Sequence, residues 1–221
     1  MISKLAPISW FLIMLCLVAA CKGNTSEELI KQGWELINIE SYSEAIKLFD
    51  EAISLNSSSP EAWHGKGFSL NGLGYEKDGA NEFVEARGYF EEAIKCFEKA
   101  IQLNSSFAYA YLDMADSENK LDNYEKAMEL VDKAIEIDPN NEDAINVKGT
   151  IYERMGEYDK ALEFYRKATA MDPECATGWY NICEILKEQS KGDKKVSAEI
   201  DYACQKTAEL YNAHDVYSIF D

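Results

Sequence analysis

Small apolar residues recur along the chain at a fixed interval. Ala93, Ala127 and Ala161 follow one another in steps of 34 residues (127 − 93 and 161 − 127). A second set, seven residues further on, keeps the same steps: Ala100, Ala134 and Ala168. A fixed period of this length indicates stacked helix pairs, because two helix backbones approach closely only where the side chain is small. The pattern therefore predicts an all-α chain of repeated helix-turn-helix units.

Aromatic residues keep the same register and divide the chain into units. Four units are expected, at 26–59, 60–107, 108–141 and 142–175. The first, third and fourth units carry the element YxxA as YSEA, YEKA and YDKA. On these residues the chain resembles the tetratricopeptide repeat (TPR) family over 26–175. The resemblance implies a right-handed superhelical solenoid, with a partial fifth repeat and capping helices over 176–221.

The second unit departs from the common length. It spans 48 residues (107 − 60 + 1), 14 more than its neighbours, and the excess falls around 75–88, between its two helices. One interpretation is a longer hairpin, in which the second helix begins about two turns earlier. The other is a flap over the groove or a contact for a partner, because long insertions in compact repeats are often functional.

The N-terminus has the pattern of a targeting segment. Ile8–Ala20 is an apolar run of 13 residues, too short for a membrane span, which needs roughly 20. The residues VAAC that end at Cys21 resemble the lipobox of prokaryotic lipoproteins. This resemblance implies a signal peptide at 1–20, lipidation of Cys21 and a short tether at 21–25, with the protein anchored on the external side of the membrane. The alternative is an uncleaved N-terminal anchor.

The remaining cysteines lie in the body of the chain. Cys183 is in the expected fifth first helix, and Cys204 is in the helix that follows it. Two antiparallel helices could bring these cysteines together, so either a Cys183–Cys204 disulfide or two buried free thiols fits the pattern. Cys96, within an amphipathic segment, is expected to be a packed thiol.

Composition limits the chemistry that is expected. The net charge is −18, and the chain has two histidines. It has no basic tract, no glycine-rich phosphate loop, no Ser–His–acid arrangement and no paired metal ligands. We therefore expect no catalysis, cofactor, metal or nucleic acid. The acidic charge is consistent with basic protein partners and equally with simple solubility.

The resemblance also implies a binding site, because first helices line a concave groove in this family. The inward positions in this sequence are Ile30, Trp34, Ile37, Asn38, His64, Phe68, Asn71, Leu112, Asp116, Asn119, Asn146, Thr150 and Glu153. A lysine and an asparagine that bind a C-terminal carboxylate in some relatives are replaced by Ile30 and Trp34. A free carboxylate is therefore not the expected ligand.

Two functions remain open at this point. The first is a scaffold that binds an extended or helical protein segment, with an apolar anchor against Trp34 and Phe68 and with Asn71 and Asn119 pairing its backbone. The second is an accessory subunit of an envelope enzyme or secretion complex, which acts through a surface contact. The alternative for Trp34 and Phe68 themselves is that the 75–88 insertion or a partner subunit covers them.

Overall fold

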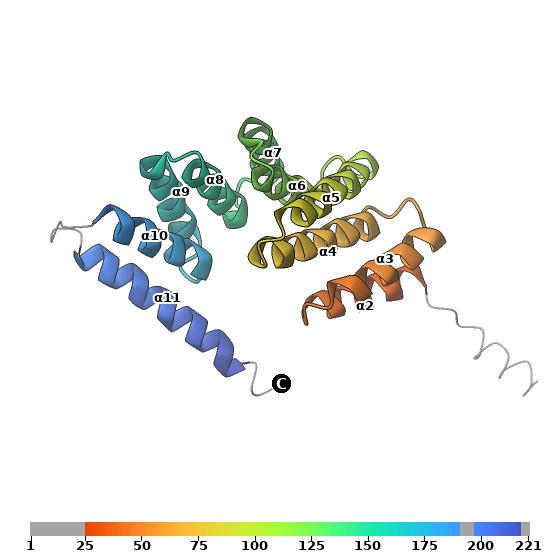
Figure 1. Ribbon diagram of the computed structural model, residues 1–221, viewed down its shortest axis with the longest axis horizontal. Helices are drawn as coiled ribbons and strands as arrows, with labels where there is room; N and C mark the ends of the chain where they lie inside the picture. The colour runs from red at the N-terminus through yellow and green to blue at the C-terminus, as the bar shows by residue number, and fades with distance from the viewer. Residues whose placement is uncertain (1–24, 191–196, 218–221) are drawn as a thin grey trace, which may run out of the picture.

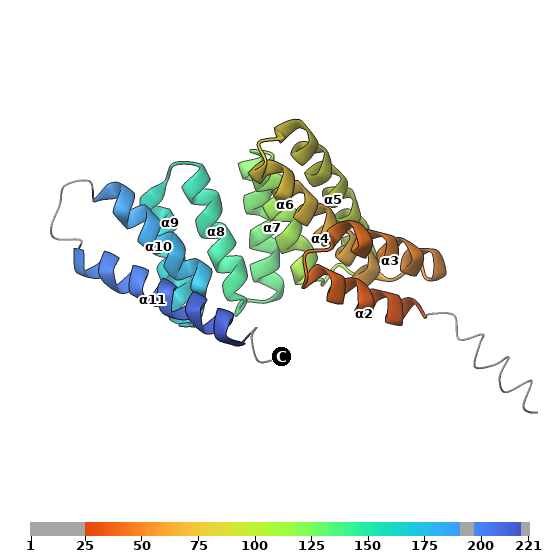
Figure 2. The ribbon, with the colours of Figure 1, turned by 60° about the horizontal axis from the view of Figure 1, so that its bottom comes forward.

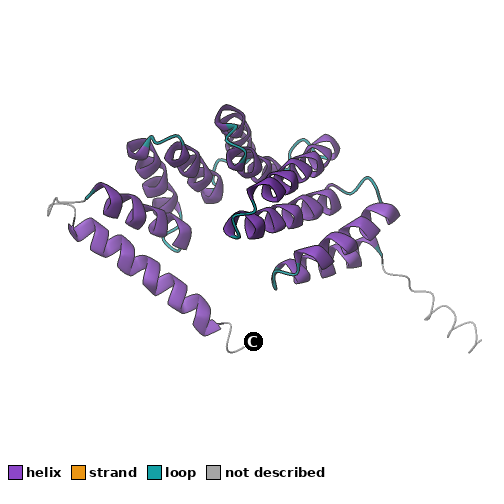
Figure 3. Ribbon diagram, viewed as in Figure 1, coloured by secondary structure: helices purple, strands orange, loops and turns teal. Residues whose placement is uncertain are grey.

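The described part of the chain is entirely helical. The computed structural model describes residues 25–190 and 197–217, so the expected signal peptide 1–20 and Cys21 lie outside the described residues. Within these ranges there are ten α-helices and no strand (Figures 1 and 3). The helices are α2 Ser26–Ile37, α3 Tyr42–Leu55, α4 Pro60–Gly79, α5 Phe83–Leu103, α6 Ala108–Lys120, α7 Tyr124–Ile137, α8 Glu142–Arg154, α9 Tyr158–Met171, α10 Ala176–Gln189 and α11 Ser197–Tyr217. The all-α solenoid expected from the sequence is confirmed.

The helices follow one another as antiparallel pairs around an arch (Figure 1). Each expected unit contains one pair, from α2–α3 to α8–α9, and α10–α11 forms a fifth pair. Each first helix packs against its own second helix and against the next pair, so the apolar core is spread along the arch in several clusters and has no single centre. No helix in the described ranges is long and apolar enough to cross a bilayer.

The small residues lie where the helices of a pair approach most closely. A methyl group built on Gly67 of α4 would lie 2.6 Å from the ring of Phe97 on α5. A methyl group built on Gly149 of α8 would likewise lie 2.6 Å from the ring of Tyr165 on α9. Glycine is therefore required at these points because the aromatic ring of the second helix occupies the space of a side chain. This contact is the physical basis of the repeat period.

The 14-residue excess of the second unit lengthens both of its helices. α4 has 20 residues and α5 has 21, whereas α6 has 13 and α7 has 14. Each helix thus gains seven residues (20 − 13 and 21 − 14), which is about two turns, so the faces that pack together stay in phase. The longer hairpin is the observed form, with α5 beginning about two turns earlier as expected, and the structure adds an equal extension of α4. Figure 2 shows the α4–α5 hairpin extending beyond the neighbouring pairs.

A disulfide joins the last two described helices. Cys183 of α10 and Cys204 of α11 are bonded, with their Cα atoms 5.1 Å apart. Cys96 and Cys175 are free and buried, and burial raises the pKa of the Cys96 thiol to about 11. The exposed face of α11 carries polar residues such as Asp201 and Gln205, as a terminal helix of a solenoid requires.

Candidate protein-binding groove

An open groove runs along the inner side of the arch. Its volume is about 1020 Å³, and five helices contribute to it: α2, α4, α6, α8 and α10. Its lining residues are Trp34, His64, Phe68, Tyr75, Tyr109, Leu112, Asp113, Asp116, Lys120, Asp143, Asn146, Val147, Thr150, Thr177, Tyr180 and Asn181. First helices therefore line the groove, and the second helices pack behind them.

The N-terminal end of the groove is aromatic. The ring of Trp34 on α2 lies 5.5 Å from that of Phe68 and 5.6 Å from that of His64, both on α4. Phe49, which is fully buried, supports Trp34 from behind with an edge-on contact at 5.9 Å. Trp34 and Phe68 remain partly exposed, so this aromatic end is a preformed apolar surface. It is the kind of surface on which an apolar side chain of a ligand is expected to pack.

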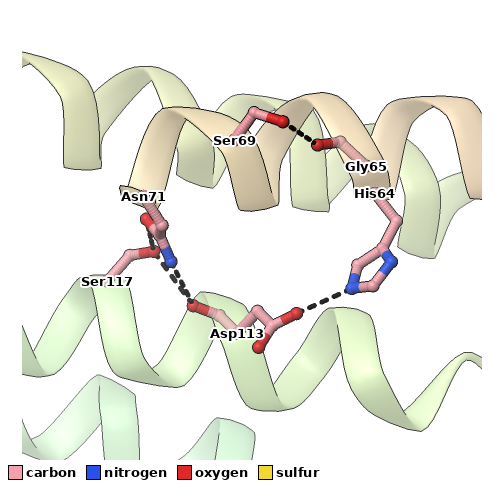
Figure 4. Close-up of polar contacts among 6 residues, drawn as sticks. All are labelled: His64, Gly65, Ser69, Asn71, Asp113 and Ser117. Carbon is pink, nitrogen blue, oxygen red and sulfur yellow. Dashed lines mark hydrogen bonds and ion pairs between the residues drawn. The ribbon is translucent and has the colours of Figure 1, made fainter. Parts of the chain in front are cut away.

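His64 connects the aromatic end to the next repeat (Figure 4). Its Nε2 lies 2.7 Å from Oδ2 of Asp113 on α6, and its ring lies 4.7 Å from that of Phe107. His64 is 7% exposed, so little of the imidazole is available to a ligand. The pair therefore fixes the position of α6 relative to α4 and places the Asp113 carboxylate beside the aromatic end.

Asn71 takes part in a buried polar network and does not face the groove (Figure 4). Ser117 Oγ donates to Asn71 Oδ1 at 2.8 Å and lies 2.9 Å from the backbone oxygen of Asp113. The Asn71 amide donates to the same backbone oxygen at 3.4 Å. Elsewhere in α4, Ser69 donates to the Gly65 carbonyl at 2.9 Å. The predicted role of Asn71 in pairing a ligand backbone is wrong, because its amide group is used between α4 and α6.

Asn119, for which the sequence predicts the same role, is also out of reach. It is 1% exposed, and its Oδ1 has no hydrogen-bond partner among the described residues. Ile37 is buried between α2 and α3, and Ile30 packs partly into the same core. Both isoleucines therefore stabilise the first repeat and do not line the groove.

Two further predicted groove residues lie at its margins. Asn38 is exposed as the C-cap of α2, beyond the lining residues. Glu153 accepts a hydrogen bond from the hydroxyl of Tyr165 at 2.6 Å and lines a smaller pocket of about 450 Å³ beside α10. The other predicted positions line the groove: Trp34, His64, Phe68, Leu112, Asp116, Asn146 and Thr150.

The lengthened α4 contributes to the wall of the groove. The hydroxyl of Tyr75 donates a hydrogen bond to Asp116 of α6. Lys120 lies 4.4 Å from the centre of the Tyr75 ring and 3.0 Å from Asp78 Oδ2. Burial raises the pKa of Asp116, and the bond from Tyr75 partly opposes that rise. The insertion thus holds α6 and closes one side of the groove, and it does not act as a loose flap over it.

Sequence reasoning missed several lining residues. Tyr109 and Asp113 precede the predicted Leu112 and Asp116 on the same face of α6, so helical spacing contains a signal for them. Thr177, Tyr180 and Asn181 lie on α10, one repeat beyond the last predicted position. The groove extends to the fifth pair because α10 packs against α9 in the same way as the earlier first helices pack.

Comparison with known proteins agrees with this geometry. Residues 146–206 match the family described as tetratricopeptide repeat, and residues 84–175 match the family described as N-terminal acetyltransferase A, auxiliary subunit. Each match covers less than half of the chain. Solved structures extend the likeness to most of its length. The fold is that of a TPR solenoid.

Three solved structures illustrate the likeness. PilF of Pseudomonas aeruginosa has a TM-score of 0.65 at 13% identity, over 84% of this chain and 76% of that chain. MamA of Desulfovibrio magneticus has a TM-score of 0.61 at 20% identity, over 87% and 98%. YrrB, described as a TPR protein with an unusual peptide-binding site, has a TM-score of 0.52 at 21% identity, over 86% and 91%. At these identities the likeness shows the fold alone. No curated protein sequence matches the chain.

Proposed function

We propose that the protein is a membrane-anchored, non-catalytic scaffold that binds a protein segment in the groove between α2 and α10. The proposal is based mainly on the aromatic end of the groove, where Trp34 and Phe68 are partly exposed and the fully buried Phe49 packs behind Trp34. A partly exposed aromatic pair in a concave site is the usual anchor of a protein-protein contact. Among the described residues no group of three or more His, Cys, Asp or Glu side chains could hold a metal ion.

The chemistry of the groove indicates what kind of segment it accepts. An apolar side chain would pack on Trp34 and Phe68. Asn146, Thr177 and Asn181 line the other part of the groove and offer amide and hydroxyl groups to a peptide backbone. Asp113 and Asp143 repel a carboxylate, so a free C-terminus or an acidic segment is a poor ligand.

A second function is favoured by the tip of the α4–α5 hairpin. Phe83 and Val84 begin α5 and are 56% and 87% exposed. Adjacent exposed apolar residues at the end of a projecting hairpin are consistent with a surface contact in a larger assembly. On this alternative the protein is an accessory subunit of an envelope complex and the groove is not the binding site.

The two functions predict opposite results for two double variants. Replacing Trp34 and Phe68 by alanine should weaken binding of the partner by about 30-fold or more, because each removes an anchor of the groove contact. The partner would first be obtained by pull-down from detergent-solubilised membranes, and its affinity then measured by titration.

The control is the pair Phe83→Ala and Val84→Ala, which removes exposed apolar side chains outside the groove. We expect this variant to bind as the unchanged protein does. Far-UV circular dichroism and thermal melts of both variants check that the fold is kept. If the hairpin variant loses binding and the groove variant keeps it, the accessory-subunit function is correct and the groove function is wrong.

Anchoring is the second part of the proposal and is tested separately. We propose that Cys21 carries the lipid, since it follows the small residues of a lipobox. The change Cys21→Ser should abolish metabolic labelling by a palmitate analogue and release the protein from the membrane fraction or leave it unprocessed. Equal labelling of the variant and the parent chain would contradict the lipid anchor.

A further inference from the structure

The groove carries negative charge that its own residues do not neutralise. Its described lining contains three aspartates, Asp113, Asp116 and Asp143, and one lysine, Lys120. Lys120 is already paired with Asp78 and lies against the ring of Tyr75. Lys120 therefore neutralises the negative charge of the three groove carboxylates only in part.

The three carboxylates differ in their partners. Asp116 accepts a hydrogen bond from the hydroxyl of Tyr75, and Asp113 is hydrogen-bonded to the imidazole of His64. The carboxylate of Asp143, in the first turn of α8, has no hydrogen bond or ion pair within the described ranges. Partial burial raises its pKa, and the nearby charges of Glu142 and Asp113 raise it further. Asp143 thus lies within electrostatic range of other carboxylates and has no ion-pair partner among the described residues.

Exposed aromatic rings line the same groove. Tyr109, one turn before Asp113 on α6, is 54% exposed, and Tyr180 on α10 is 47% exposed. Carboxylates beside exposed aromatic faces are the groups that bind an ammonium or guanidinium ion, through charge-assisted hydrogen bonds and cation–π contact. We call Asp113, Asp143, Tyr109 and Tyr180 the acidic subsite.

We propose that the acidic subsite binds a lysine or arginine side chain of the segment held in the groove. This inference rests on the proposed function of the groove and specifies its ligand. Asp113 joins the two parts, since its carboxylate lies 2.7 Å from His64 and the His64 ring lies 5.6 Å from that of Trp34. The basic residue of the ligand therefore lies a few residues from the apolar residue that packs on Trp34 and Phe68. Charge complementarity, in a chain of net charge −18, favours such a segment over an acidic one.

The test selects ligands without assuming their sequence. A displayed library of random dodecapeptides would be selected on the full chain purified in detergent. Lysine or arginine near a large apolar residue should be enriched among the selected peptides. One selected peptide and its lysine-to-glutamine version would then be titrated against the unchanged chain and the variant Asp143→Asn.

A double-mutant cycle isolates the contact. Asp143→Asn should weaken binding of the lysine peptide about tenfold, as expected for a hydrogen bond to a charged group. The same variant should bind the glutamine peptide with unchanged affinity. The effect of Asp143→Asn on the affinity for the lysine peptide should become smaller at high salt. The control Glu91→Gln removes one charge from an exposed position on α5 outside the groove and should leave both affinities unchanged.

The outcomes separate this inference from the function on which it rests. Selected peptides without basic residues, or equal effects of Asp143→Asn on both peptides, overturn the acidic subsite. If such peptides still lose binding on replacement of Trp34 and Phe68 by alanine, the groove function stands without it. Peptides whose binding depends neither on Asp143 nor on the aromatic end contradict both.

Discussion

Phe97→Ala should destabilise the protein by about 3–5 kcal/mol, the usual cost of removing a large aromatic side chain from a core. Phe97 of α5 is fully buried and belongs to the largest core cluster of the described residues. Its ring fills the space that Gly67 leaves open on α4 and lies 5.8 Å from that of His64. The loss of stability should extend to adjacent repeats, since each helix pair packs on the next. Urea and thermal unfolding would measure it.

The same helix provides the control. Phe83→Ala removes an identical side chain that is 56% exposed at the beginning of α5, so its effect should stay within about 0.5 kcal/mol. Comparable losses from the two changes would mean that the contact between Gly67 and Phe97 does not hold α4 and α5 together.

Replacing Cys183 and Cys204 by serine should destabilise the C-terminal pair by about 3 kcal/mol, the value expected for opening a closed loop of this size. The bonded residues are separated by 21 positions, and α11 is the terminal helix of the described chain. The loss should be local, because α11 packs mainly on α10. Limited proteolysis should therefore cleave α11 in the variant well before the other helices.

Reducing agent provides the matched comparison for the disulfide. It should accelerate cleavage of α11 in the unchanged protein and have no effect on the double serine variant, whose remaining described cysteines, Cys96 and Cys175, are already free. Equal protection of α11 with and without reductant in the unchanged protein would contradict a stabilising role for the disulfide.

The fold was predictable because packing fixes residue size at a regular interval. Gly67 and Gly149 each face an aromatic ring of the paired helix, and Ala127 and Ala161 are fully buried at equivalent points. Small residues are therefore required at equivalent points of successive helix pairs, and they recur at a fixed interval in the sequence. The place of the insertion and its form as a longer hairpin were predictable as well, but residue spacing does not show how the extra length is divided between the two helices. The structure uses it to place Tyr75 against Asp116.

The groove was less predictable because helical position alone does not say which neighbour covers a side chain. Asn71 and Asp116 both occupy inward positions on first helices, yet Asn71 is covered by Ser117 and Asp116 lines the groove. The difference depends on the distance and angle between adjacent first helices. Asp143 was missed for a related reason, since its charge is informative only once Asp113 is seen beside it.

Site-specific photocrosslinking in intact cells would show whether the groove is the binding site, because it captures the partner at the groove whatever its identity. A photoreactive phenylalanine analogue would replace Tyr109, which is exposed in the groove, or Val84, which is exposed at the tip of the α4–α5 hairpin. We expect a discrete crosslinked product from position 109 that is lost when Trp34 and Phe68 are also changed to alanine, and no such product from position 84. A product from position 84 with none from position 109 would contradict the groove as the binding site.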